Sequence, residues 1–214
     1  MLKTIDIFSC LDEHTLADLE KAAVRKKFTK NALLFSRGDA SDSMYVIVEG
    51  KVKAVLYNEE GKEILLSIFG PGDYFGEIGM LDGQPRTASL VTKTACSLLM
   101  LKRHALDSII FNNAAMSAKL LRQMLLKLRQ ATIRIENLTF MNVYGRIVSL
   151  LLQLADKTEG GGLYLDKITH QEIANMVGAS REMVSRIMKE LHSAGYIETD
   201  NQRIKIHKRF PTTF

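Results

Sequence analysis

Residues 169–191 constrain the fold most strongly, because they read as two short amphipathic helices joined by a tight turn. Thr169 and Glu172 have the spacing of a capping box, which satisfies free backbone amides where the first helix begins. Gly178 falls in the turn, where a left-handed backbone conformation costs glycine little, and Ser180 is a favourable N-cap for the second helix. The segment therefore predicts a helix-turn-helix.

The second of these helices has two faces of different chemistry. The apolar side chains that we expect to face the interior are Val184, Ile187, Met188 and Leu191. The polar side chains of the opposite face are Arg181, Glu182, Ser185, Arg186 and Lys189. An arginine can donate two hydrogen bonds to guanine, and a glutamate can accept one from the cytosine amine. Because phosphates repel a carboxylate, Glu182 favours a helix that reads base edges in DNA; a solvated helix of mixed charge is the alternative interpretation.

The segments beside this helix pair offer further groups for a DNA backbone. Residues 195–207 read as a β-hairpin that turns at Asp200-Asn201, and this hairpin would form a wing. The basic residues in and just after the hairpin are Arg203, Lys205, Lys208 and Arg209. The candidate DNA-binding residues of the helix pair are Thr169, His170, Gln171, Ser180, Arg181, Glu182, Ser185, Arg186 and Lys189.

The charge distribution permits a polyanionic partner for the C-terminal half. The chain has 29 basic and 24 acidic residues, a net charge of +5. Residues 1–114 hold 14 basic and 15 acidic side chains, whereas residues 115–140 hold five basic and one acidic. Residues 141–214 hold ten basic and eight acidic side chains. The positive excess therefore lies after residue 114, in the part that contains the helix pair.

The N-terminal half is organised differently. Residues 12–27 read as a helix, and from Phe28 to about Leu101 short β-rich runs alternate with glycine-rich turns. The runs are 32–35, 44–48, 52–56, 64–69 and 97–101. Strands at this spacing predict an antiparallel barrel or roll, so the expected fold class is α+β with an N-terminal antiparallel β-roll.

Residues 114–140 lack glycine and proline and read as one long helix. Apolar residues at alternating spacings of three and four form a seam along it, namely Leu121, Met124, Leu128, Ala131, Ile135 and Leu138. Leu120 and Leu125 belong to a second stripe beside this seam. We expect one stripe to pack on the roll and the other on a partner chain, which gives a homodimer; a helix buried within its own domain is the alternative.

These patterns divide the chain into three segments. The expected domains are a β-roll at 1–113, a dimerisation helix at 114–140 and a winged helix-turn-helix at 141–214. A hinge is expected near 139–142, followed by an amphipathic helix over 143–155 and a loop over 158–162.

Composition argues against several other classes of protein. The chain has no apolar run of roughly 18–20 residues, and Asp6 precedes any long apolar stretch, so we expect a cytoplasmic protein without a signal peptide. Cys10 and Cys96 are far apart and suggest neither a disulfide framework nor a zinc cluster, so no metal site is expected. The five histidines are scattered, which argues against a metal-dependent enzyme of the cupin type and leaves no candidate catalytic residue.

Glycines are densest in the N-terminal half over residues 70–89. Gly76 and the glycines around it let a ligand approach the backbone closely, while Arg86 supplies a fixed positive fork and Thr87 a hydroxyl. Together these groups could hold one phosphate. Glu77 is unsuited to a phosphate, yet it can accept a hydrogen bond from a ribose hydroxyl.

This cassette, in a β-roll followed by a long helix and a winged helix-turn-helix, resembles the CRP/FNR family of bacterial transcription regulators over nearly the whole chain. The resemblance implies that a small effector, first of all cyclic AMP, binds in the roll without a covalent cofactor. It also implies homodimers that recognise TGTGA-like palindromes, and RNA polymerase as a further partner of an activator. Gly76 and Glu77 would contact the ribose side, and Arg86 and Thr87 the cyclic phosphate. The implied effector-binding residues are Gly76, Glu77, Ile78, Gly79, Arg86, Thr87, Ala88 and Thr132.

The chain departs from the family on the long helix. In cyclic-AMP-responsive members adjacent hydroxyl residues contact the adenine amine, whereas the matching pair here is Ala131-Thr132. A lost hydrogen bond costs about 0.5–1.5 kcal/mol, which weakens selectivity without abolishing binding. Cyclic GMP, cyclic di-GMP and an active state without ligand therefore stay open as alternatives. A nucleotide-sensing module that controls a partner protein, and not a gene, is the alternative of another class.

Overall fold

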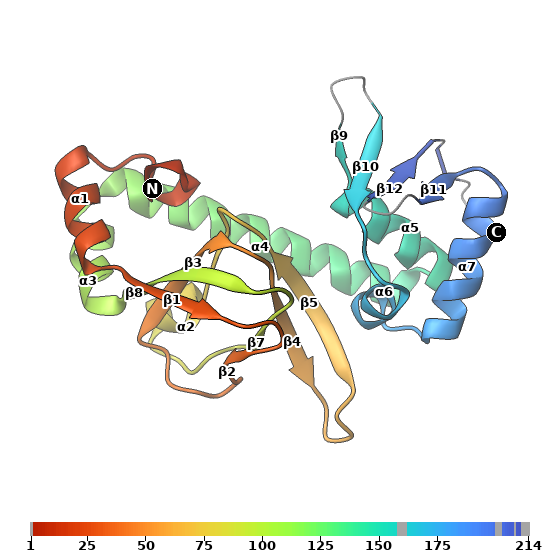
Figure 1. The fold of residues 1–214 in the computed structure, drawn as a ribbon, viewed down its shortest axis with the longest axis horizontal. Coiled ribbons are helices and arrows are strands. Elements are labelled where there is room, and N and C mark those ends of the chain that lie inside the picture. The colour runs from red at the N-terminus through yellow and green to blue at the C-terminus, as the bar shows by residue number, and fades with distance from the viewer. Residues whose placement is uncertain (1, 158–161, 200–202, 208, 211–214) are drawn as a thin grey trace. The chain divides into compact units, whose positions relative to one another are not determined.

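The computed structural model describes residues 2–157, 162–199, 203–207 and 209–210 (Figure 1). The chain divides into two compact units, Met1–Leu128 and Arg129–Phe214. The long helix α4 (Ala114–Phe140) belongs to both units, because the boundary falls within it. Within the described residues, no helix is both long enough and apolar enough to cross a bilayer.

Two antiparallel four-stranded sheets form a β-roll in the first unit (Figure 1). The strand order is β1-β8-β3-β6 in one sheet and β2-β7-β4-β5 in the other. The strands are β1 (Val24–Phe28), β2 (Leu33–Phe35), β3 (Ser43–Glu49), β4 (Val52–Tyr57), β5 (Glu63–Phe69), β6 (Tyr74–Phe75), β7 (Ser89–Thr92) and β8 (Cys96–Lys102). Aromatic rings from both sheets meet in the roll, where Phe75 lies 5.5 Å from Tyr45 and 6.2 Å from Phe35 between ring centroids. The predicted β-roll is therefore confirmed.

Helices close one end of the roll and enclose a second part of its core. They are the 3₁₀ helices η1 (Leu2–Thr4) and η2 (Asp6–Phe8), and the α-helices α1 (Glu13–Ala22), α2 (Glu77–Asp82), α3 (Arg103–Asn112) and the start of α4. Phe8, Leu106 and Met116 are fully buried in this cluster. Lys119 of α4 donates to the carboxylate of Asp6 at 2.9 Å, and this contact lowers the pKa of Asp6. Apolar packing and this ion pair together hold α4 against the N-terminal segment.

The helix predicted over residues 12–27 is too long, and the prediction is wrong from Val24 onward. Helix α1 ends at Ala22, and Val24–Phe28 forms strand β1, which pairs with β8 from Val24↔Met100 to Phe28↔Cys96. The ladder with β8 satisfies the backbone of this segment, and local spacing cannot reveal such a distant partner. The five predicted strands match β2, β3, β4, β5 and β8 to within one residue at each end. The sequence did not indicate β6, β7, α2 or α3.

Helix α4 has the predicted bounds, Ala114–Phe140. Its seam is exposed in the single chain apart from the half-buried Met124, and Leu121 and Leu128 keep 61% and 64% of their surface accessible. The second stripe does not act as one surface. Leu120 is buried in the core of the first unit, whereas Leu125 remains 49% exposed, so only part of that stripe packs on the roll.

The second unit contains a helix-turn-helix and a small antiparallel sheet (Figure 1). Its helices besides α4 are α5 (Val143–Leu154), α6 (His170–Val177) and α7 (Arg181–Ser193). Its strands are β9 (Asp156–Lys157), β10 (Leu163–Asp166), β11 (Ile197–Thr199) and β12 (Arg203–Ile206), in the order β11-β12-β10-β9. The predicted hairpin is present as β11 and β12, while its predicted turn at 200–201 and residues 158–161 of the predicted loop lie outside the described residues. The predicted break before residue 143 is also confirmed, because Asn142 caps α5 by accepting from the amide of Gly145.

Candidate functional site

Arg86 lies at the centre of the phosphate cassette and is only 5% exposed. Its Nη1 donates to the carbonyl oxygens of Ser43 and Gly76, both at 2.7 Å, and its Nη2 donates to the Ser43 hydroxyl at 3.2 Å. The guanidinium also lies 4.1 Å from the centroid of the Phe35 ring. Burial lowers the pKa of Arg86, yet an arginine side chain stays protonated at neutral pH. The cassette thus contains a fixed positive charge, and its buried Nε has no hydrogen-bond partner among the described residues.

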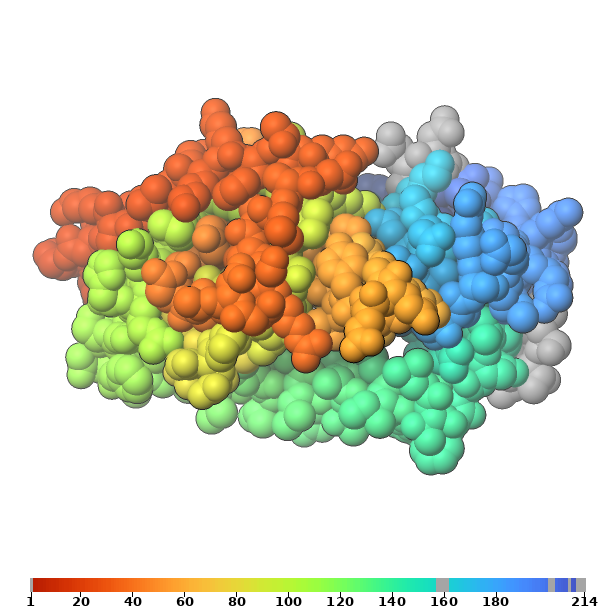
Figure 2. Space-filling view, turned by 90° about the horizontal axis from the view of Figure 1, so that it is seen from below, coloured from red at the N-terminus to blue at the C-terminus, as the bar shows by residue number. Residues whose placement is uncertain are grey.

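The backbone at Gly76 is folded so that only glycine fits there. Its φ is +83°, and a Cβ at this position would lie 2.5 Å from Nη1 of Arg86. The glycine-rich segment continues from Gly76 into the short helix α2. Ile78 and Thr87 are exposed, whereas Gly79 and Ala88 are buried. In Figure 2 the yellow segment around α2 reaches the surface of the first unit.

Glu77 is almost fully buried, at 2% exposure, and its carboxylate forms a short ion pair with Lys127 of α4. The Lys127 ammonium also lies 5.2 Å from the centroid of the Tyr74 ring. Burial, and then the charge of Glu77, raise the pKa of the Tyr74 hydroxyl. Lys127 is not among the site residues predicted from the sequence. Its spacing of four residues from Ala131 on the same helix face was the available signal.

Ala131 and Thr132 lie on α4, and both are exposed. They belong to the second unit, whereas the cassette belongs to the first. The expected contact of Thr132 with a ligand therefore stays a prediction.

The helix-turn-helix of the second unit has the predicted local chemistry. The Thr169 hydroxyl accepts from the Glu172 amide at 3.1 Å, and the Glu172 carboxylate accepts from the Thr169 amide at 2.9 Å, which makes a complete capping box. Gly178 ends α6 with a φ of +66°, and the Ser180 hydroxyl caps α7 by accepting from the Met183 amide at 3.2 Å. In this structure the side chains of Thr169 and Ser180 therefore serve as caps.

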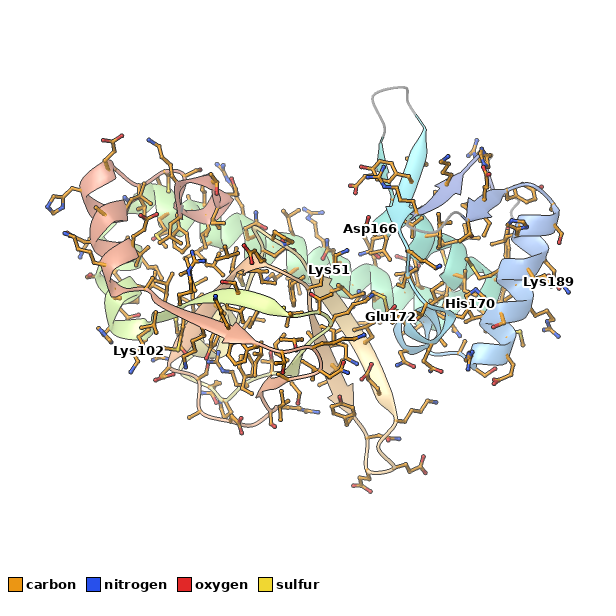
Figure 3. The ribbon with its side chains drawn as sticks, in the orientation of Figure 1. Lys51, Lys102, Asp166, His170, Glu172 and Lys189 are labelled. Atoms are coloured by element: carbon orange, nitrogen blue, oxygen red, sulfur yellow. The ribbon has the colours of Figure 1, made fainter. Side chains whose placement is uncertain are left out.

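The two faces of α7 separate as predicted. The buried side chains are Val184, Ile187, Met188 and Leu191. Arg181, Glu182, Arg186 and Lys189 are exposed, and Lys189 projects from the outer side of α7 in Figure 3. Ser185 is half-buried, and its hydroxyl lies 2.9 Å from Nδ1 of His170 at the start of α6.

The remaining candidate contacts lie on α6 and on the wing. Gln171 is exposed and donates to the Asn175 side chain at 2.8 Å. On the wing, Arg203 lies with its guanidinium carbon 4.4 Å from the centroid of the Tyr164 ring, and Lys205 is exposed. Lys208 lies outside the described residues.

Comparison with known proteins identifies the family. Residues 25–113 match the cyclic nucleotide-binding domain, and residues 145–209 match the Crp-like helix-turn-helix domain. The chain is 35% identical over 210 residues to the CRP-like cAMP-activated global transcriptional regulator of Mycobacterium tuberculosis, covering 96% of this chain and 94% of that protein. The chain belongs to the CRP/FNR family of transcription regulators.

Other CRP/FNR members are similar over most of their length. The cAMP-activated global transcriptional regulator CRP of Salmonella typhimurium is 35% identical over 186 residues, covering 85% of this chain and 88% of that protein. The solved structure of the c-di-GMP responsive global regulator CLP of Xanthomonas campestris has a TM-score of 0.70. It covers 92% of this chain and 100% of the other, and at 24% identity it supports the fold alone. Ala131 and Thr132 fall between the two matched family domains.

Proposed function

We propose that this CRP/FNR regulator is a homodimer that binds a cyclic nucleotide in its β-roll and then binds palindromic DNA with TGTGA-like half-sites. The observation that carries this proposal is the buried guanidinium of Arg86, which is fixed beside Gly76 and has its Nε unpaired. A fixed positive fork next to a glycine backbone suits a cyclic phosphate. Cyclic AMP is the first candidate, since relatives that are 35% identical are described as activated by it.

Ribose recognition would involve Glu77 together with Lys127. Because the carboxylate is already paired with the lysine ammonium, a ribose hydroxyl would donate to a carboxylate whose charge is balanced. Lys127 lies on α4, so a ligand at Glu77 would also act on the helix that carries the dimer seam. Only a ligand that binds one arrangement of the protein better than another can shift the population toward it. We propose that this difference gates DNA binding.

Cyclic GMP and cyclic di-GMP are the competing effectors, because Ala131 removes one hydroxyl from the pair that would contact adenine. Calorimetry with the whole protein against cyclic AMP, cyclic GMP and cyclic di-GMP tests this choice. We expect cyclic AMP to bind with a stoichiometry of one per chain and to bind more tightly than the other two. If cyclic GMP or cyclic di-GMP binds more tightly, that nucleotide is the effector and cyclic AMP is not. If none of the three binds, nucleotide sensing is refuted.

On the DNA side, we propose that α7 enters the major groove and that Arg181, Glu182 and Arg186 contact base edges. Lys189, Gln171, Arg203 and Lys205 would contact phosphates. His170, the first residue of α6, would lie beside the DNA backbone. RNA polymerase is the proposed further partner. We propose that the regulator acts in the cytoplasm and that it is not an enzyme. Selection of DNA from a random library, with and without cyclic AMP, should recover TGTGA palindromes, and recovery of an unrelated motif would refute the half-site assignment.

A further inference from the structure

His170 and Ser185 join the two helices of the helix-turn-helix on the side proposed to face DNA. His170 is the first residue of α6, and Ser185 lies in the second turn of α7, three residues after Glu182 and one before Arg186. The distance from Nδ1 of His170 to the Ser185 hydroxyl oxygen is 2.9 Å, and both residues are half-buried. Figure 3 shows His170 lying toward α7. Neither residue is needed for capping, since Thr169 and Ser180 cap the two helices.

A serine hydroxyl has one donor and two acceptor sites, so a serine can contact either kind of base edge. Inside a helix such a hydroxyl often donates to the carbonyl of the preceding turn. Here the hydrogen-bond partner of Ser185 is an imidazole nitrogen on another helix. The hydrogen-bonding role that Ser185 can play toward DNA therefore depends on which partner donates in this pair, the Ser185 hydroxyl or Nδ1 of His170.

The position of His170 determines that choice. In a helix-turn-helix the first helix crosses the DNA backbone, and phosphate oxygens only accept hydrogen bonds. Nε2 of His170 has no hydrogen-bond partner among the described residues, so it is available to a phosphate. A neutral imidazole has one N–H, and a phosphate favours that N–H at Nε2, which leaves Nδ1 as an acceptor. The Ser185 hydroxyl then donates to Nδ1 and has only acceptor sites left for a base.

We propose that His170 is a specificity-positioning residue, which makes Ser185 an acceptor that selects a base with an amine on its major-groove edge, adenine or cytosine. The inference rests on the proposed function, because it requires α7 to read DNA. The opposite arrangement, with the hydrogen on Nδ1, would leave the serine hydroxyl to donate. It would favour guanine or thymine and would accept adenine only through N7, an acceptor that guanine also has. A preference for adenine or cytosine over both guanine and thymine therefore distinguishes the two arrangements.

The test is DNA selection and binding titration with the whole protein and four single variants. Wild type and Ser185→Ala identify the base that Ser185 contacts, as the position whose preference the alanine removes. At that position wild type should prefer adenine or cytosine by about three- to tenfold, which is the range of one hydrogen bond. His170→Phe keeps a ring of similar size without a nitrogen, and it should reduce this preference to less than twofold while preferences at other positions persist.

Two further variants keep the inference falsifiable. His170→Asn places an amide oxygen near the position of Nδ1 and should restore the preference for adenine or cytosine. This variant tests the inference even when thermal melting shows that His170→Phe is unstable. His192→Phe is the matched control, since His192 is exposed in the last turn of α7, and its preferences should equal those of wild type.

Three results would overturn the inference while leaving the proposed function intact. They are a preference for guanine or thymine at the Ser185 position, an unchanged preference in His170→Phe, or no change at any position in Ser185→Ala. A wild-type protein that shows no sequence preference at all would instead refute the proposed function, and this inference with it.

Discussion

Nη1 of Arg86 lies 2.7 Å from the carbonyl oxygen of Gly76, and a Cβ at residue 76 would lie 2.5 Å from that same nitrogen. The charged fork and the glycine turn can therefore come this close only because residue 76 has no side chain. The contact fixes the guanidinium in the roll before any ligand arrives. Preorganisation of this kind reduces the free-energy cost of ordering a side chain on binding.

Gly76→Ala should destabilise the first unit and weaken effector binding more than Gly72→Ala. Both glycines have positive φ, +83° and +90°, but an added Cβ at Gly72 meets nothing within 4 Å. The control therefore carries backbone strain alone, about 1–2 kcal/mol, while the test variant must also displace Arg86. Thermal melting and calorimetry with cyclic AMP measure the two effects. Equal losses of stability and of cyclic AMP affinity in the two variants would show that the close approach of Gly76 to Arg86 contributes to neither.

Arg86→Lys should reduce effector affinity at least tenfold although the charge is retained. A lysine ammonium cannot reproduce the planar fork that reaches Ser43 and Gly76 simultaneously, and each lost charge-assisted hydrogen bond costs about 1.5–3 kcal/mol. Calorimetry with cyclic AMP measures the loss. Arg37→Lys, at an exposed arginine outside the cassette, should bind like wild type. A lysine variant with wild-type affinity would indicate that only the charge matters.

Lys127→Met should lower the free energy of unfolding by about 1–3 kcal/mol, because it leaves the buried carboxylate of Glu77 without its partner. Adding Glu77→Gln to it should recover part of that loss. Urea unfolding of the two single variants and the double variant gives the interaction energy. Lys62→Met, at an exposed lysine, is the control and should leave stability unchanged. Strictly additive losses would show that the two side chains do not interact.

Local patterns in the sequence were sufficient where the structure depends on neighbours along the chain. The capping box of Thr169 and Glu172, the positive φ of Gly178 and the buried stripe through Leu191 were all predictable, since each depends on residues within a few turns. The bounds of α4 were predictable for the same reason, because no residue between Ala114 and Phe140 interrupts a helix.

Contacts between distant residues could not be predicted in this way. Local spacing predicts a helix where strand β1 forms, because the partner strand β8 lies about 70 residues away in the chain, at Val24↔Met100 and its neighbours. The pairing of Glu77 with Lys127, 50 residues apart, likewise follows from the fold and not from any local motif. The residues proposed to bind the effector and DNA were predictable mainly through the family resemblance, and their roles stay predictions.

Leu128→Glu should convert the proposed dimer into monomer at micromolar concentration. Leu128 is 64% exposed in the single chain and lies in the middle of the seam, so a carboxylate there would be buried against the partner's apolar seam. Sedimentation velocity gives the oligomeric state. Gln130→Glu adds the same charge at an exposed residue outside the seam and should remain dimeric. A Leu128→Glu variant that stays dimeric would place the interface elsewhere.

Arg181→Ala and Arg186→Ala should each weaken binding to the selected DNA by about 1–3 kcal/mol and relax the preference at one base pair. Lys189→Ala is the comparison, because loss of a phosphate contact weakens binding to all sequences and reduces the slope of log affinity against log salt by about 0.9. Anisotropy titrations at several salt concentrations separate the two behaviours. Uniform weakening by Arg181→Ala or Arg186→Ala would mean that the arginine contacts the backbone and not a base.

The most direct test of effector-gated DNA binding is the affinity of the whole protein for a TGTGA palindrome with and without cyclic AMP. Coupling between two sites in one protein is commonly 5- to 150-fold, on the order of 1–3 kcal/mol. We expect saturating cyclic AMP to tighten binding to the palindrome at least tenfold and to leave binding to a scrambled duplex nearly unchanged. Equal affinity for the palindrome without ligand and with cyclic AMP, cyclic GMP or cyclic di-GMP would contradict the account.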